Sequence, residues 1–357
     1  MQKNKFDILV KSALSSISLA FLIILSLGLT PSCSEYNKVV KGFNNYEQKY
    51  EMAYQMFKDE KYVQALTLFE QILPKYKLTP KGEDIYYHYA YCHWKIKDYY
   101  LSGFYFKQFV KQYPNSKFAE ECAFLSAMSS VKISPEFSLD QSDTYVALDE
   151  IQLFIDEYPF SARIDTCNVI MDKLRGKLEL KLYNYAKLYY KMEDYKASYT
   201  ALHAALQQFP NTAYREEMLY MMLNSSHKLA ENSVSYKKLE RYEETIKVYH
   251  KFAARYPESK YRKSADKIFE DTKFQIELSK MNLKISKVEN IGDLAKKRTE
   301  FDKLKPEITK YLEGVTNLKV KNGMTEKMKY LEKDLIKAEE KAAKKSESTK
   351  ENEEKVK

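Results

Sequence analysis

The side chains most able to do chemistry are few in this sequence, and their spacing matches no catalytic or metal-binding pattern. The 357 residues include 5 His. His88 and His93 are five positions apart, whereas a helical metal pair needs a separation of four. No Cys-x-x-Cys, Gly-x-Ser-x-Gly or Gly-rich phosphate loop occurs. We therefore expect no catalytic residue, no metal, no cofactor and no enzymatic activity.

Cys33 is the residue whose context predicts a chemical modification. The N-terminus is basic, residues 13–29 form an apolar run, and small residues lead up to Cys33. This arrangement resembles a bacterial lipoprotein signal, which implies cleavage before Cys33 and attachment of lipid to its thiol. An ordinary signal peptide, or a membrane anchor with a chance cysteine, is the alternative. The run is short for a spanning helix, which needs roughly 20 residues.

The composition indicates a helical protein, and it favours a protein partner over a nucleic-acid partner. Only 8 Gly are present against 31 Tyr, and the formal charge of +9 is interspersed with acids. No motif for binding RNA or DNA accompanies that charge, so we expect no nucleic-acid partner. Cys92, Cys122 and Cys167 are far apart in sequence, and we expect small buried residues there.

Five stretches of the chain share one helical register. Their first positions are Tyr62, Tyr99, Thr144, Tyr195 and Tyr242. Three residues on, each has a small residue: Ala65, Ser102, Ala147, Ser198 and Thr245. Large residues follow at offset 7, apolar residues at offset 10 and an aromatic residue at offset 14. These offsets lie on one face of an α-helix, and the small residue allows a neighbouring helix to approach closely.

Proline marks the end of four of these helices. The motif Tyr/Phe-Pro-x-Ser/Thr predicts a helix end, a turn and the start of the next helix. The spacing between repeats exceeds the usual 34 residues, and we place the extra residues between or after helices, at 133–142 and 229–238.

A further helix precedes each of these runs, so the pattern is one of repeated helix pairs. Ala53, Ala90 and Ala186 each lie twelve residues before the small anchor of the helix that follows. We predict an all-α tetratricopeptide-repeat superhelix of about five helix-turn-helix repeats with a charged helical C-terminal extension. The expected segments are a signal peptide at 1–32, a lipidated linker at 33–43, the repeat domain at 44–280, the extension at 281–344 and a disordered tail at 345–357.

The first helices supply the candidate binding site, because in such repeats their outward faces line a groove. The register assigns to this groove Tyr50, Tyr54, Phe57, Tyr87, Tyr91, Trp94, Tyr183 and Tyr190. Flat amphipathic rings suit an extended peptide that carries aromatic side chains, and Lys58 or Lys95 could pair with its carboxylate. The alternative is that the rings pack between helices.

The combination of a lipid-ready Cys33, about five repeats, an Asp140-Gln141-Ser142 insertion before the third repeat and a long helix entering the fourth resembles the BamD family of outer membrane assembly factors. The resemblance covers about residues 33–275. It implies a non-enzymatic subunit of the β-barrel assembly machinery, anchored through Cys33 to the outer membrane and facing the periplasm. The implied partners are a BamA-type barrel insertase and unfolded outer membrane proteins with a C-terminal aromatic signal.

A second interpretation of the function keeps the same fold but assigns other partners. Other envelope lipoproteins with tetratricopeptide repeats, such as scaffolds that coordinate cell-wall synthesis with the outer membrane, fit the same repeats. Copurification with a BamA-type barrel distinguishes the two readings.

Overall fold

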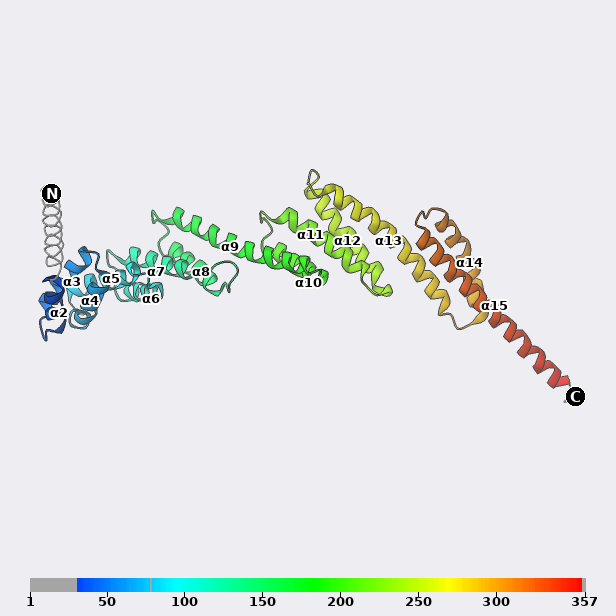
Figure 1. Cartoon of the computed structure of the whole chain (residues 1–357), viewed down its shortest axis with the longest axis horizontal. Coiled ribbons are helices and arrows are strands. Elements are labelled where there is room, and N and C mark those ends of the chain that lie inside the picture. The colour runs from blue at the N-terminus through cyan, green and yellow to red at the C-terminus, as the bar shows by residue number, and fades with distance from the viewer. Residues whose placement is uncertain (1–30, 78, 355–357) are drawn as a thin grey trace, which may run out of the picture. The chain divides into compact units, whose positions relative to one another are not determined.

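The computed structural model describes residues 31–77 and 79–354, with side chains described at 35–77 and 79–347. These residues are helical except for the turns and loops that join the helices (Figure 1). The chain divides into two compact units, unit 1 as far as Leu178 and unit 2 from Glu179 onward. Each unit is described by itself. The predicted signal segment, 1–32, lies outside the described residues except for its last two positions.

Unit 1 is a stack of helix pairs. Its helices are α2 (Pro31–Lys41), α3 (Tyr46–Lys58), α4 (Tyr62–Tyr76), α5 (Pro80–Lys95), α6 (Tyr99–Gln112), α7 (Ala119–Ile133), α8 (Ser142–Glu157) and the first half of α9 (Ile164–Lys191). Its buried apolar residues form three clusters, centred on α3–α5, α5–α7 and α7–α9. Each pair therefore shares its core with the first helix of the next pair.

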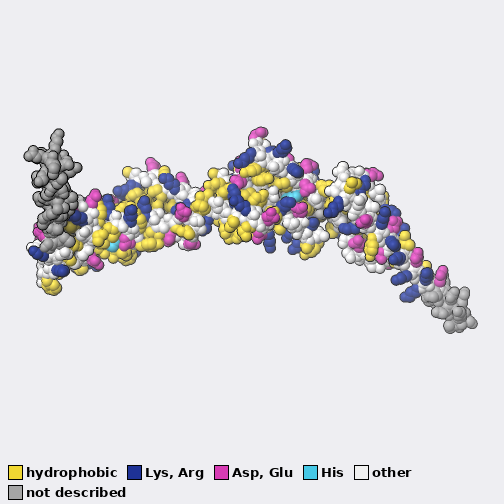
Figure 2. Space-filling view, in the orientation of Figure 1, with side chains coloured by type: hydrophobic (Ala, Val, Ile, Leu, Met, Phe, Trp, Pro, Cys, Tyr) yellow, Lys and Arg dark blue, Asp and Glu magenta, His cyan; other side chains and the backbone are white. Residues whose placement is uncertain are grey.

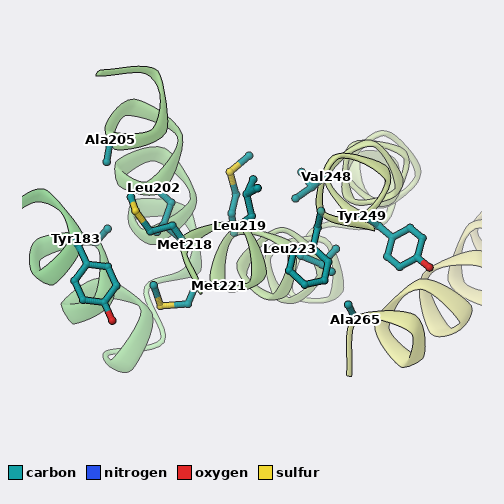
Figure 3. Packing of buried hydrophobic residues seen from close by; sticks show 13 residues of the cluster. Tyr183, Leu202, Ala205, Met218, Leu219, Met221, Leu223, Val248, Tyr249 and Ala265 are labelled. Atoms are coloured by element: carbon teal, nitrogen blue, oxygen red, sulfur yellow. The ribbon is translucent and has the colours of Figure 1, made fainter. Parts of the chain in front are cut away.

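Unit 2 continues the same pattern and then changes it. It contains the second half of α9, then α10 (Tyr195–Gln208), α11 (Arg215–Glu231), α12 (Ser235–Arg255), α13 (Arg262–Glu289), α14 (Leu294–Glu313) and α15 (Leu318–Glu354). One core joins α9 to α13, and Figure 3 shows Leu202 close to Met218 in it, with Val248 further along the same core. A second core joins the end of α13 to α14 and α15 through Ile285, Phe301 and Leu331.

The predicted repeat register is confirmed by burial. The five small anchors are all 0% exposed: Ala65, Ser102, Ala147, Ser198 and Thr245. Each polar anchor forms a hydrogen bond between its hydroxyl and another hydroxyl; Ser102 Oγ, for example, lies 2.7 Å from Ser129 Oγ. A buried hydroxyl without such a partner would be costly. The all-helical, tetratricopeptide-like fold class is thereby confirmed.

Tight turns close the helix pairs, and they use left-handed backbone at residues other than glycine. Lys97 has φ 65° and Glu193 has φ 60°. The next residue in each case is an aspartate that caps the second helix: Asp98 accepts from the Leu101 amide at 3.3 Å, and Asp194 accepts similarly from the amide three positions on. These caps fix where α6 and α10 begin.

The Pro-x-Ser motif joins one pair to the next through its serine. Ser116 Oγ accepts from the Phe118 amide at 3.0 Å and donates to the Glu83 carboxylate on the preceding first helix. Ser161 and Ser259 make the same two kinds of bond. The serine lies two positions before the N-cap residue Phe118, so it caps the turn and not the helix itself.

Three segments differ from the sequence expectation. The extra residues at 229–238 are mostly helical, because α11 extends to Glu231 and α12 already begins at Ser235. Helix α2 occupies most of the expected linker at 33–43, and the expected boundary at 280 falls inside α13. Helix α15 continues through 345–354, and disorder of the tail stays a prediction. The loop at 134–141 is present as expected, held by Gln141 Nε2 donating to the Glu136 carbonyl at 2.7 Å.

Candidate functional site

Helices α3 and α5 carry six of the eight residues predicted to line a binding groove. Their Ala53 and Ala90 are fully buried. The predicted positions flank these alanines, and the α3 rings also contact α4, as where Tyr54 lies 5.2 Å from Phe69. Tyr50, Tyr54 and Phe57 on α3 are part-buried, each with some ring surface reaching solvent. The same holds for Tyr87, Tyr91 and Trp94 on α5.

Most of these rings touch one another and form one continuous series of contacts, which we call the aromatic row; Tyr87 also lies 5.2 Å from His88. The members of the row, in spatial order, are Tyr50, Tyr54, His88, Phe57, Tyr91, Tyr87 and Phe118. Neighbouring ring centroids lie between 4.2 Å, at Tyr87–Phe118, and 5.9 Å, at Phe57–Tyr91. Trp94 instead packs between the α5–α7 and α7–α9 cores and meets Tyr99 at 5.2 Å.

Hydrogen bonds hold the row in place from below. The Tyr54 hydroxyl donates a hydrogen bond to the Asp84 carboxylate. Burial, and to a smaller extent this bond, raises the pKa of Tyr54 far above its ordinary value. Burial likewise raises the pKa of Tyr87. His88 Nδ1 lies 2.8 Å from the Asp84 carbonyl oxygen. The tyrosine hydroxyls therefore stay protonated, and the rings form a preorganised surface.

Charged groups lie beside the row. At its Tyr50 end, Lys81 lies 4.3 Å from the ring centroid and 2.8 Å from the Glu47 carboxylate, so its charge is already paired. Beside Tyr91, in the interior of the row, Lys95 lies 5.4 Å from the ring centroid and is exposed. The row is thus open to a negative group near Lys95.

The two remaining predicted residues belong to unit 2. Tyr183 is only 7% exposed and stacks on Tyr214 at 4.3 Å. Lys187 Nζ donates to the Tyr183 hydroxyl at 2.6 Å and to Glu217 at 2.9 Å, and these two bonds raise the pKa of Lys187. Tyr190 packs part-buried against the same core. Tyr183 offers a peptide little ring surface, and its main contacts are internal.

The Tyr183–Tyr214 stack belongs to a contact that recurs between repeats. Each time, a ring on a first helix meets the residue just before the next first helix. Tyr87 stacks on Phe118 at 4.2 Å, and Tyr220 stacks on Tyr261 at 4.5 Å. At another junction the residue just before the next first helix is a cation: the Arg163 guanidinium lies 4.9 Å from the centroid of the Phe124 ring. These positions therefore join repeats, and Tyr87 and Phe118 also belong to the row.

Two members of the row were missed by sequence reasoning. His88 was considered only as a metal ligand, yet it lies between Tyr54 and Phe57 at 4.8 Å from each. Within the described residues no group of three or more His, Cys, Asp or Glu is arranged to hold a metal. Phe118 lies outside the first-helix register, and its position just before α7 was the only available signal.

A second apolar surface of unit 1 lies between the second helices α6 and α8. A hollow of about 240 Å³ is floored by Ser126 and Ser129 of α7 and rimmed by Tyr100 and Phe104, the latter 54% exposed. An ion pair between Lys107 and Glu150 at 2.5 Å joins the two walls. We call this surface the outer groove. The ion pair interrupts it, whereas the aromatic row is continuous.

The cysteines separate into one terminal position and three core positions. Cys33 lies near the start of α2, and its side chain is outside the described ones. Cys92, Cys122 and Cys167 are free and buried, as expected, and burial raises the pKa of Cys92 to about 12. Such thiols are unreactive. In the part of the chain that the structure describes, no helix is long and apolar enough to span a bilayer.

The surface mixes both signs of charge, and Figure 2 shows basic and acidic side chains interspersed over the visible face.

Comparison with known proteins identifies the family of the chain. A family model described as YfiO, outer membrane lipoprotein, matches residues 44–241, which is more than half of the chain. A tetratricopeptide-repeat model matches residues 233–259. No curated protein matches the chain.

Two solved structures align over most of the chain with low similarity. The apo form of RapI aligns over 82% of this chain and 99% of its own, with 13% identity and a TM-score of 0.27. A Rap protein complexed with Competence and Sporulation Factor aligns over 88% of this chain and 81% of its own, with 14% identity and a TM-score of 0.26. Similarity at this level carries no argument about this chain.

Proposed function

The chain belongs to the YfiO family of outer membrane lipoproteins, and from that premise we propose that it is a non-enzymatic scaffold subunit of the machinery that assembles β-barrel proteins in the outer membrane. In this proposal lipid on Cys33 anchors the protein, and its repeats face the periplasm. The repeats dock on a BamA-type insertase and help receive unfolded outer membrane proteins. The single observation that carries the proposal is the family match across residues 44–241, which spans the first four repeats.

The aromatic row is the surface that we assign to the unfolded client. An extended client segment with aromatic side chains at its C-terminus could lay its rings on Phe57 and Tyr91. Its terminal carboxylate would then lie toward Lys95 or Lys58, both exposed. Rigid, half-buried rings lose little entropy on binding, which favours such a surface for many related sequences. The outer groove suits an extended segment less well, because Lys107 and Glu150 cross it.

Affinity purification of the tagged, lipidated protein from membranes, followed by mass spectrometry, tests the scaffold role. We expect recovery of a BamA-type insertase in a fixed ratio to this protein. Recovery of cell-wall enzymes without a barrel insertase would overturn the proposal and support the alternative envelope scaffold. The Cys33→Ser form, purified in parallel, tells whether association depends on anchoring.

Peptide binding tests the assignment of the client site. The probe is a short synthetic peptide with alternating aromatic residues and a free C-terminal carboxylate, followed by fluorescence anisotropy. Tyr91→Ala should weaken binding about tenfold, whereas Phe104→Ala, an aromatic truncation in the outer groove, should leave it unchanged. Equal weakening by Lys95→Ala and by amidation of the peptide would indicate that this lysine receives the carboxylate.

The opposite pattern decides against the row. If Phe104→Ala weakens binding and Tyr91→Ala does not, the client occupies the outer groove. Circular dichroism must show unchanged helicity for both variants, because Tyr91 also contacts Phe57 at 5.9 Å.

A further inference from the structure

The segment that joins the anchoring Cys33 to the first repeat is helical and is packed against the body of unit 1. Tyr36, Val39 and Val40 of α2 lie against the α3–α5 core. The Tyr36 hydroxyl donates to the Gln64 carbonyl on α4 at 3.3 Å. Helix α2 is therefore attached to the first repeat from Tyr36 to Val40, only a few residues after the lipid position.

The turn after α2 presents a fully exposed aromatic side chain. Phe43 is 94% exposed, and the following Asn44 adopts left-handed backbone with φ 58°. The turn is held by Asn45, whose Nδ2 donates to the Val39 carbonyl at 3.1 Å. A Cβ at Gly42 would meet the Asn45 side chain at 2.4 Å, so any larger residue there would displace this side chain. The exposure of Phe43 is thus fixed by the turn.

Basic side chains accompany Phe43 on the exposed side of α2. Lys38 and Lys41 are both exposed, in the last turn of the helix. They are three positions apart and so lie on one side of the helix, while Val39 and Val40 face the core. An exposed apolar ring and two exposed cations in one short segment are the composition of a segment that meets an anionic lipid surface.

The distance along the chain places this patch close to the membrane. From Cys33 to Lys41 the helix rises about 12 Å, at about 1.5 Å per residue. Two further residues add at most about 7 Å. A lipid on Cys33 therefore keeps Phe43 within about 20 Å of the anchoring point, and the bilayer that holds the lipid is the surface within reach.

We propose that Phe43, Lys38 and Lys41 form a second membrane contact, in which the ring enters the headgroup region and the lysines meet anionic phospholipid. This inference rests on the lipid anchor at Cys33 in the proposed function. Acyl chains hold the protein on the membrane, and the patch fixes how α2 and the first repeat lie on it. Stable membrane attachment commonly combines acyl chains with a basic or apolar patch in this way.

The test uses the lipidated full chain, purified from membranes, with the lipid on Cys33 verified by mass spectrometry. In a Trp94→Phe background, which removes the single Trp, Phe43→Trp is compared with Phe160→Trp. Phe160 is a matched control because it is 100% exposed and lies in the turn between α8 and α9, far from α2 in the sequence. Both proteins are inserted in vesicles of phosphatidylethanolamine and phosphatidylglycerol with brominated acyl chains.

We expect brominated lipid to quench the Phe43→Trp emission at least twofold and to leave the Phe160→Trp emission unchanged. Adding Lys38→Glu and Lys41→Glu should reduce that quenching by half or more. As a second measurement on the unsubstituted protein, vesicles should slow acetylation of Lys38 and Lys41 about threefold relative to the exposed Lys132.

The outcomes separate this inference from the anchor. Lipid on Cys33 with no quenching of the Phe43→Trp emission, and with equal acetylation of the three lysines, overturns the membrane patch and leaves the anchor standing. Absence of lipid on Cys33 overturns the anchor and this inference together.

Discussion

The stack between Tyr87 and Phe118 makes the clearest quantitative prediction, because it joins the second repeat to the third and also ends the aromatic row. The two rings lie 4.2 Å apart and are nearly parallel, with an interplanar angle of 10°. We expect truncation of either ring to alanine to lower the free energy of unfolding of unit 1, and the two truncations to be coupled.

The magnitude follows from burial and ring geometry. Removing a fully buried aromatic ring costs about 3–5 kcal/mol, and both rings are part-buried, so each single variant should lose about 2 kcal/mol. Stacked pairs contribute about 0.5–1.5 kcal/mol beyond their burial. The double variant should therefore be about 1 kcal/mol more stable than the sum of the single effects predicts.

Urea unfolding followed by Trp94 fluorescence measures this coupling. Trp94 is the single Trp of the chain and lies two turns from Tyr87 on α5, so its signal reports on unit 1. With a denaturant slope of about 2 kcal/mol/M, each single variant should lower the midpoint by about 1 M. The control cycle pairs Tyr87→Ala with Phe160→Ala, whose fully exposed ring should add nothing.

Coupling below about 0.3 kcal/mol, or coupling equal to that of the control cycle, would refute the reasoning. It would mean that the rings are close without stabilising the junction between repeats. The recurring contacts at the other junctions would then also have to be attributed to packing alone.

Three further predictions concern the small anchor, the turn and acid stability. Ala147→Leu places a branched side chain where no solvent-exposed surface remains, and Trp94 fluorescence should report a loss of about 1–3 kcal/mol. Lys97→Gly relieves left-handed backbone and should leave stability unchanged or raise it by up to about 1 kcal/mol, whereas Lys111→Gly in the exposed last turn of α6 should lower it by up to about 1 kcal/mol in the same assay. Burial lowers the pKa of His227 below its ordinary value, so the unfolded state binds a proton at a higher pH than the folded state does. Unit 2 should therefore lose stability as the pH falls below about 6.5, and hydrogen exchange of α11 should show this loss. An equal loss in the His227→Gln variant would contradict the prediction.

Much of the candidate site was predictable because helical periodicity assigns faces. Tyr50, Tyr54, Phe57, Tyr87 and Tyr91 were placed on one stripe from their distance to Ala53 and Ala90, and the structure brings them into one row. Periodicity cannot say which rings meet across a turn. His88 was unexpected because it reaches two α3 rings from α5, and Trp94 left the row because its ring enters the adjoining cores.

The sequence by itself determined the repeat: the helices, their order, the small buried anchors and the serine turns. These depend on local periodicity and on backbone chemistry within a few residues. Only the tertiary structure decided how α2 lies on the first repeat, how α13–α15 share a core, and which first-helix rings join one repeat to the next. Those contacts pair residues that are distant in the chain, and their free energy depends on ring orientation and burial, which no local pattern encodes.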